Sequence, residues 1–216
     1  VQTGSLLKIW EQGYAEVDGS TINAGSIVNY GADIGLTVKN GSSINSGDIL
    51  LDYEGRMNVD WGGTGGSSVT STGTLTVDST EGLNIFDDAS VQADQIVIGS
   101  YTNSSGNVMV INNDSHKPTL LESSDSLIVG LAGNGYLDTR GSGARVFADS
   151  ITLGSLSGSS GTISVDGGWI DSLGTLTVGA NGSGVINLTI GEGGTANLFS
   201  GDSFLGRYSG GIGSIY

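Results

Sequence analysis

The stretch TLTVGANGSGVINLTIGEGGTANLF, residues 175–199, sets alternating apolar segments on either side of glycine-rich corners. Such alternation is typical of a strand with one buried face, and glycine readily adopts the positive φ angles that tight corners need. A phosphate-binding loop would lead from its glycines into a helix, whereas GANGSG leads into VINLTI, a second strand. We therefore interpret the glycines as corners of a turning chain: Gly179, Gly182, Gly184, Gly191, Gly193 and Gly194.

The same unit of strand, corner and strand recurs along the chain. The aliphatic side chains of one unit cannot offset the conformational entropy lost when the unit becomes ordered. Stacking can offset it, because each coil pairs with the next and the apolar core becomes continuous. The repeat therefore predicts an all-β fold, a parallel β-helix or β-solenoid of about nine coils. The strands of successive units begin at residues 6, 26, 48, 74, 95, 126, 150, 175 and 203.

Within the strands, the alternation predicts which side chains line the core. Ile163, Val165, Leu176 and Val178 alternate with hydroxyl side chains, so we expect them to point into the coil. The intervening hydroxyls are expected to face outward and to form ladders along the rod: Thr162, Ser164, Thr175 and Thr177.

The composition excludes several classes of protein. The 216 residues include 39 Gly but only 1 Pro and no Cys, which fits neither collagen nor a disulfide scaffold. The net charge of −15, with only 7 Lys plus Arg, argues against nucleic acid and anionic membranes as partners. We expect a single β-helix domain over residues 1–216, a piece of a longer surface protein. Residues 1–94 would form less regular coils or a cap, and residues 95–216 regular repeats.

Two segments carry a resemblance to a known family. SITLGSLSGSSGTISVDGG (150–168) and GTLTVGANGSGVINLTIGEGGTA (174–196) resemble the repeats of type V secretion autotransporter passenger domains. The resemblance implies a right-handed, pectin-lyase-like β-helix, exported through a bacterial outer membrane and displayed or released at the cell surface. It also implies the role of a stalk, adhesin or aggregation factor. The partners would be host-cell or neighbouring-cell surface molecules, glycans or further copies of the chain.

The sequence does not support a catalytic serine. Ser203 lies in GDSFLG, a Gly-Asp-Ser motif, but this segment fills the position of SITLG and SLIVG in other units. A serine nucleophile needs a base and an orienting acid, and the single histidine, His116, lies in a loop. The segment beginning at Gly62 lacks the Asp of the calcium-binding nonapeptide. We expect a chain with no catalytic residue, cofactor or bound metal.

Acidic residues in successive units suggest the alternative function. Lyases and hydrolases of β-helical fold gather carboxylates from neighbouring coils beside a basic residue. Asp138 and Asp166 follow strands in successive units and are expected on one face, with Arg140 and Arg145 nearby. Solvated turn acids are the favoured interpretation. The alternative is a carbohydrate-active β-helix, either a polysaccharide lyase or hydrolase or a tailspike-like glycan binder.

Aromatic residues are few, and an exposed aromatic ring can stack on a sugar. Trp61 and Trp169 lie in glycine-rich turns, so we select them, together with Asp138 and Asp166, as candidate binding residues. Packing in the core or at a corner is the competing interpretation. The longer segments 61–72 and 111–125 are expected to project as loops, which on solenoids often form the binding face.

Overall fold

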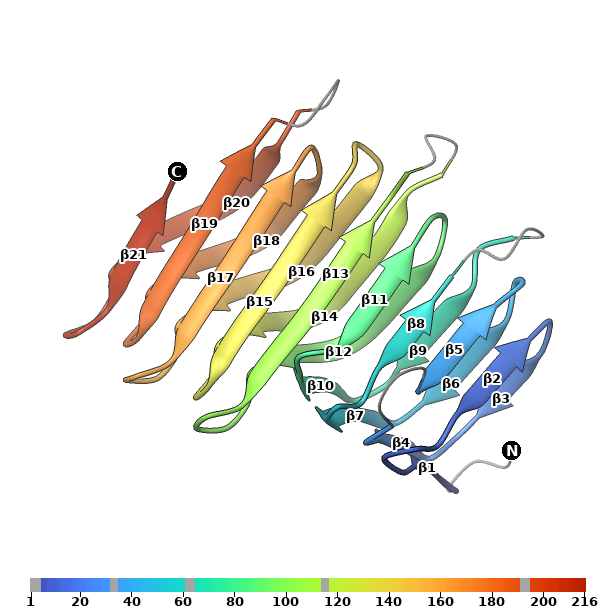
Figure 1. Ribbon diagram of the computed structural model, residues 1–216. Coiled ribbons are helices and arrows are strands. Elements are labelled where there is room, and N and C mark those ends of the chain that lie inside the picture. Colours follow the sequence, from blue (N-terminus) through green and yellow to red (C-terminus); the bar gives the residue numbers. More distant parts are fainter. Residues whose placement is uncertain (1–4, 32–34, 61–64, 114–116, 191–194) are drawn as a thin grey trace.

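The computed structural model describes residues 5–31, 35–60, 65–113, 117–190 and 195–216, and every regular element within them is a β-strand (Figure 1). The strands form two sheets that run along the molecule. Sheet A contains β1 (Leu6–Ile9), β3 (Thr21–Asn23), β4 (Ser26–Asn29), β6 (Ser43–Ser46), β7 (Asp48–Tyr53), β9 (Ser68–Ser71), β10 (Thr74–Ser79), β12 (Ser90–Ile98), β14 (Thr119–Val129), β16 (Ala144–Leu153), β18 (Trp169–Val178) and β20 (Asn197–Leu205). Sheet B contains β2 (Ala15–Asp18), β5 (Leu36–Lys39), β8 (Met57–Val59), β11 (Leu83–Phe86), β13 (Ser105–Ile111), β15 (Asn134–Arg140), β17 (Ser160–Asp166), β19 (Ser183–Thr189) and β21 (Ile212–Ile215).

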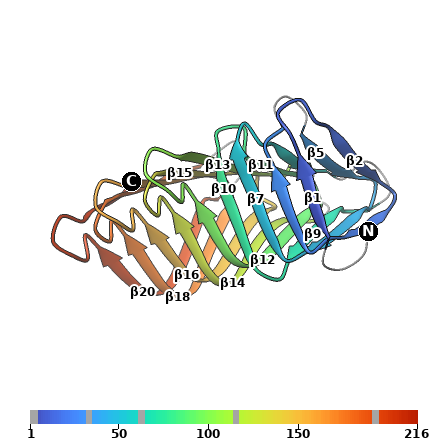
Figure 2. The ribbon, with the colours of Figure 1, turned by 90° about the horizontal axis from the view of Figure 1, so that it is seen from below.

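Every strand pairing among these residues is parallel and joins one coil to the next. Figure 2 shows the strands of sheet A lying side by side from the N-terminal to the C-terminal end. The fold is the predicted β-solenoid. In the described part of the chain the nine strands of sheet B mark nine passes, and about 7 full turns are formed. The number of full turns is therefore slightly below the prediction of about nine coils.

The core runs along the inside of the coil as a continuous apolar column. Ile163, Val165, Leu176 and Val178 are buried, as the alternation predicted, because strands in register place like side chains above one another. Thr177 lies between the core residues Leu176 and Val178 and so faces outward as predicted, but it is only 3 % exposed. Its register neighbours in sheet A are Thr152 and Phe204, and these side chains share its outer surface.

Sheet A changes along the rod. In the first coils two separate short strands form it, such as β1 and β3 or β4 and β6. From β12 onward a single long strand crosses both positions, with a register shift in its middle. Side-chain hydroxyls hold two of these shifts, because Ser123 Oγ donates to Ser126 O at 2.9 Å and Ser172 Oγ donates to Thr175 O at 3.0 Å.

The described glycines among those quoted at the outset, Gly179, Gly182 and Gly184, have structural roles. Gly179 directly follows β18 at a corner and has a φ of +73°. Gly184 was predicted as a corner, but it lies inside β19, where a Cβ would be 2.3 Å from the Gly179 backbone nitrogen. Gly184 thus permits close approach of two backbone segments, and Gly182 does the same beside Ser159. Gly191, Gly193 and Gly194 lie outside the described residues. The equivalent corner glycines with positive φ are Gly99, Gly130, Gly154 and Gly206.

Candidate functional site

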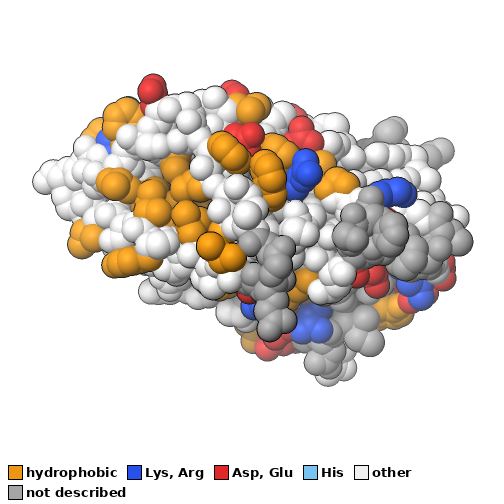
Figure 3. Space-filling model, turned by 90° about the horizontal axis from the view of Figure 1, so that it is seen from above, with side chains coloured by type: hydrophobic (Ala, Val, Ile, Leu, Met, Phe, Trp, Pro, Cys, Tyr) orange, Lys and Arg blue, Asp and Glu red, His pale blue; other side chains and the backbone are white. Residues whose placement is uncertain are grey.

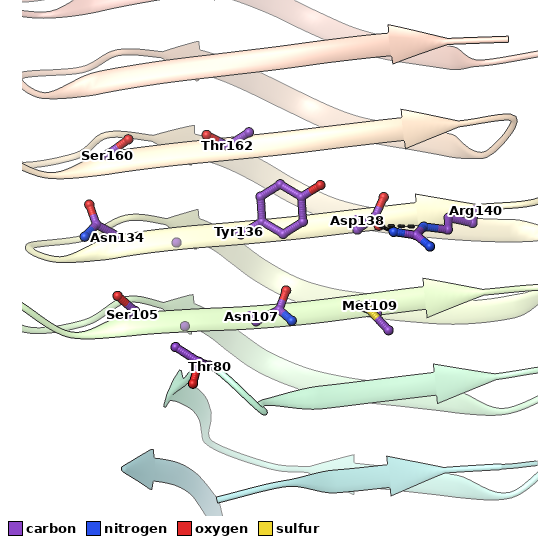
Figure 4. Close-up of a pocket in the computed structure, with 12 residues that line it drawn as sticks. Thr80, Ser105, Asn107, Met109, Asn134, Tyr136, Asp138, Arg140, Ser160 and Thr162 are labelled. Atoms are coloured by element: carbon purple, nitrogen blue, oxygen red, sulfur yellow. Dashed lines mark hydrogen bonds and ion pairs between the residues drawn. The ribbon is translucent and has the colours of Figure 1, made fainter. Parts of the chain in front are cut away.

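The outer surface of sheet B carries a depression of about 520 Å³ across β13, β15 and β17 (Figure 4). We call it the sheet B depression. Its walls are mostly hydroxyl and amide side chains, with one aromatic ring, one thioether and one ion pair. The residues that line it are Thr80, Ser105, Gly106, Asn107, Met109, Asn134, Gly135, Tyr136, Asp138, Arg140, Ser160 and Thr162.

The alternation of β15 positions the central residues of the depression. Leu137 is fully buried in the core, so its neighbours Tyr136 and Asp138 emerge on the outer surface of the sheet. The Tyr136 ring, 39 % exposed, has Asn107 and Thr162 as its register neighbours on the adjacent strands. The depression therefore offers an aromatic face with amide and hydroxyl groups beside it, which is a combination that suits a sugar ring.

Asp138 and Arg140 form the ion pair of the depression. Arg140 Nε donates a hydrogen bond to Asp138 Oδ2 at 2.7 Å, and Arg140 Nη2 forms an ion pair with the same oxygen at 2.6 Å. The Asp138 side chain is 3 % exposed, whereas the Arg140 side chain is 56 % exposed. The hydrogen bond with Asp138, and secondly the charge of Asp138, raise the pKa of the Arg140 guanidinium. The Asp138 carboxylate is thus bound to Arg140 and shielded from solvent.

Asp166 lies close to this pair, as the sequence predicted for the two acids. It is the register neighbour of Arg140 on β17, so Asp138 and Asp166 lie on the outer side of adjacent strands. Arg140 is the predicted basic neighbour. One carboxylate oxygen of Asp166, Oδ1, is buried and has no hydrogen-bond partner within the described part of the chain.

Of the two selected tryptophans, the structure describes Trp169. Trp61 is outside the described residues. Trp169 begins β18 in sheet A, where its ring packs against Phe199 with ring centroids 5.7 Å apart. The Arg145 guanidinium lies 5.4 Å from the centroid of the Trp169 ring. Trp169 is therefore a partly covered side chain of the other sheet, and Arg145 accompanies it rather than the two acids.

Other apolar side chains are exposed near the C-terminal end of the rod. Figure 3 shows hydrophobic side chains gathered toward the end that carries β19 to β21. Exposed apolar residues in or beside these strands include Ile190, Ile212 and Tyr216, at 65 % exposure or more.

The remaining sequence motifs concern a serine nucleophile and a metal site. Ser203 lies in β20, and its hydroxyl is 2.5 Å from the Ser200 hydroxyl. His116 is outside the described residues. Within the described ranges, no group of three or more His, Cys, Asp or Glu side chains is arranged to hold a metal ion.

The two predicted loops are shorter than expected. Residues 68–71 of the first form β9, and residues 119–125 of the second belong to β14. Apolar alternation inside these segments indicates strands. Their glycine and polar content led instead to the prediction of loops. The sequence analysis also missed Tyr136, whose signal was a single aromatic residue at an outward position of the run GYLDTR.

The stacked parallel strands define the chain as a parallel β-solenoid protein. Comparisons with protein-family models, with curated proteins and with solved structures found no match to it. Among the residues that the structure describes, no helix is long and apolar enough to cross a membrane.

Proposed function

We propose that this chain is a non-catalytic segment of a bacterial surface-displayed or secreted passenger protein, in which it acts as a stalk and adhesin. The observation that carries the proposal is the outer face of sheet B, where in-register strands present rows of polar side chains around the exposed Tyr136. A rod of this kind holds many weak contact points in a line, and multivalent attachment turns weak contacts into strong adherence. The resemblance to autotransporter passenger repeats supports the cellular setting.

The pairing of Asp138 supports a binding role over a catalytic one. A general base must have a free lone pair within hydrogen-bond reach of the substrate proton. In the sheet B depression, one Asp138 oxygen accepts a hydrogen bond from Arg140 Nε and forms an ion pair with Arg140 Nη2, and the carboxylate is almost fully buried. This arrangement suits a group that holds Arg140 in place for contacts with a partner.

Adherence of the purified chain tests the proposal. Beads coated with the chain should attach to cultured epithelial cells or aggregate with one another, whereas uncoated beads should do neither. Tyr136→Ala should weaken this adherence, and Tyr208→Ala, which removes a more exposed tyrosine between β20 and β21, should not. Coated beads that neither attach nor aggregate would overturn the adhesin function. If Tyr136→Ala beads adhere as well as wild-type beads, the outer face of sheet B is not the adhesive surface.

A second candidate function is carbohydrate processing, which the shared surface of Asp138 and Asp166 favours. Incubation with a panel of polysaccharides, followed by a reducing-end assay and a measurement of the ultraviolet absorbance of unsaturated products, tests it. New reducing ends that disappear in Asp166→Asn would establish an enzyme. If no polysaccharide is cleaved, the carbohydrate-processing function is wrong and the non-catalytic function is retained.

A further inference from the structure

A second depression, of about 450 Å³, lies near the N-terminal end of the rod and is lined mainly by aromatic rings. We call it the aromatic groove. Four aromatic side chains, Trp10, Tyr30, Tyr53 and Tyr101, line it together with Lys8, Glu11 and Asp52. The sequence analysis did not select any of these residues.

The solenoid brings these rings together from four different passes of the chain. Trp10 directly follows β1, Tyr30 directly follows β4, and Tyr53 is the last residue of β7. Tyr101 follows β12 after the corner at Gly99. Parallel strands stacked about 4.8 Å apart bring their carboxyl ends to one edge, so the aromatic residues form a row along the rod axis.

The rings offer an open surface rather than filling a core. The Trp10 and Tyr30 rings are stacked, with centroids 5.9 Å apart and planes inclined by 26°. The Lys8 ammonium lies 3.8 Å from the centroid of the Trp10 ring. Trp10 is 63 % exposed, Tyr53 is 64 % exposed and Tyr101 is 50 % exposed. Large apolar side chains gathered at an exposed surface indicate a site that a ligand covers.

Asp52 bonds the Tyr101 ring and the backbone of Tyr53. The Tyr101 hydroxyl donates to Asp52 Oδ1 at 3.0 Å, across 49 residues of sequence, and the Tyr53 backbone N–H donates to the same oxygen at 2.7 Å. The hydrogen bond to Asp52 raises the pKa of the Tyr101 phenol above its ordinary value. Tyr53 has a φ of +61°, a left-handed conformation that is rare for a bulky residue. The groove is therefore fixed before a ligand arrives.

The charges of the groove select the class of ligand. The apolar C–H face of a pyranose ring stacks on tryptophan and tyrosine, while carboxylates such as Glu11 and Asp52 accept hydrogen bonds from sugar hydroxyls. The chain carries a net charge of −15, and the groove itself contains two carboxylates and one lysine. Uronic acids and sulfated glycans are thus repelled at long range, whereas uncharged sugars are not.

We propose that the aromatic groove binds a neutral oligosaccharide, whose successive pyranose rings stack on the row of aromatic side chains along the rod. This inference deepens the proposed function by naming the ligand class of a second site, and it rests on the adhesin function only for its biological setting. The row of rings runs along the axis, so the groove favours a linear chain of sugars over a single sugar.

Isothermal titration calorimetry on the purified chain tests the inference with neutral cello-, xylo-, manno- and malto-oligosaccharides and with polygalacturonate as the anionic probe. We expect at least one neutral series to bind, with affinity that rises with chain length, and polygalacturonate not to bind. Trp10→Ala and Tyr101→Ala should each lower the affinity about tenfold, since the loss of one stacking contact of this kind approaches 1.4 kcal/mol. Trp169→Ala is the matched control, a tryptophan of sheet A outside the groove, and should bind normally.

Three results would overturn the inference: no binding of any neutral series, unchanged binding by both groove variants, or an equal loss in Trp169→Ala. Circular dichroism confirms that each variant is folded, and Tyr101→Phe, which keeps the ring, should retain most of the affinity. The two proposals fail separately. If coated beads adhere but no oligosaccharide binds, only the proposed ligand of the aromatic groove is wrong. If an oligosaccharide binds but coated beads do not adhere, only the adhesin function is wrong.

Discussion

Replacement of Gly154 by alanine tests whether the corner glycines hold the solenoid together. Gly154 has a φ of +59°, and a Cβ at this position would lie 2.2 Å from the backbone oxygen of Ser183 in the next coil. A left-handed conformation costs an L-residue about 1–2 kcal/mol, and forcing extra volume into close-packed structure costs about 1–3 kcal/mol. Gly154→Ala should therefore lower the free energy of unfolding by about 2–5 kcal/mol.

Gly158 provides the matched control within the same turn. Its φ is +83°, but no atom lies within 4 Å of a Cβ built there. Gly158→Ala thus incurs only the conformational cost, about 1–2 kcal/mol. Urea unfolding of both variants, followed by circular dichroism, gives the comparison, and with a slope of about 2 kcal/mol/M the Gly154 variant should lose about 1–2.5 M in midpoint.

Equal midpoints for the two variants would refute the reasoning, because close approach to Ser183 would then contribute nothing. A larger loss in Gly158→Ala would refute it as well. Hydrogen exchange should in addition show faster opening of β17 and β19 in the Gly154 variant, since its clash lies between their coils.

Three further outcomes follow from buried or paired polar groups. Asn29 is fully buried and bonds backbone groups of two coils, so Asn29→Ala should cost about 2–4 kcal/mol in calorimetric unfolding; an unchanged melting temperature would contradict this. Asp138→Asn should cost about 1 kcal/mol, because its partner Arg140 is half exposed, and the loss should shrink in 1 M salt. The Tyr14 hydroxyl lowers the pKa of Glu16, so the stabilising contribution of Glu16 is present above its unfolded pKa and is lost as the pH falls through the lower folded pKa. An NMR titration should place the Glu16 midpoint below 4.5, and Tyr14→Phe should raise it.

The fold was predictable because its determinants are local and repeated. Runs such as SITLG and TLTVG specify a strand and a corner within five residues, and the recurrence of such units requires stacking. The burial of Ile163 and Leu176 followed from the same alternation. The role of Gly184 did not, because its environment combines the backbone at Val178 and Gly179 with the Leu153 side chain of the preceding coil.

The candidate sites were only partly predictable. Asp138 and Asp166 lie at related positions of successive units, so their shared face followed from the repeat. Trp169 belongs to the other sheet, which its glycine-rich surroundings did not indicate. The hydrogen bond between Tyr101 and Asp52 spans 49 residues and two unlike coils, and no local pattern relates these two positions.

The amino-acid sequence by itself determined that the chain forms short strands separated by glycine corners and that these strands stack in parallel. It did so because alternation and positive φ act through each residue and its immediate neighbours. Only the tertiary structure decided which side chains meet on the outer surface, including Tyr136 beside Asn107 and Thr162, and Trp10 beside Tyr30. The coils differ in length, so the position of each side chain around the rod depends on the complete path of the preceding chain.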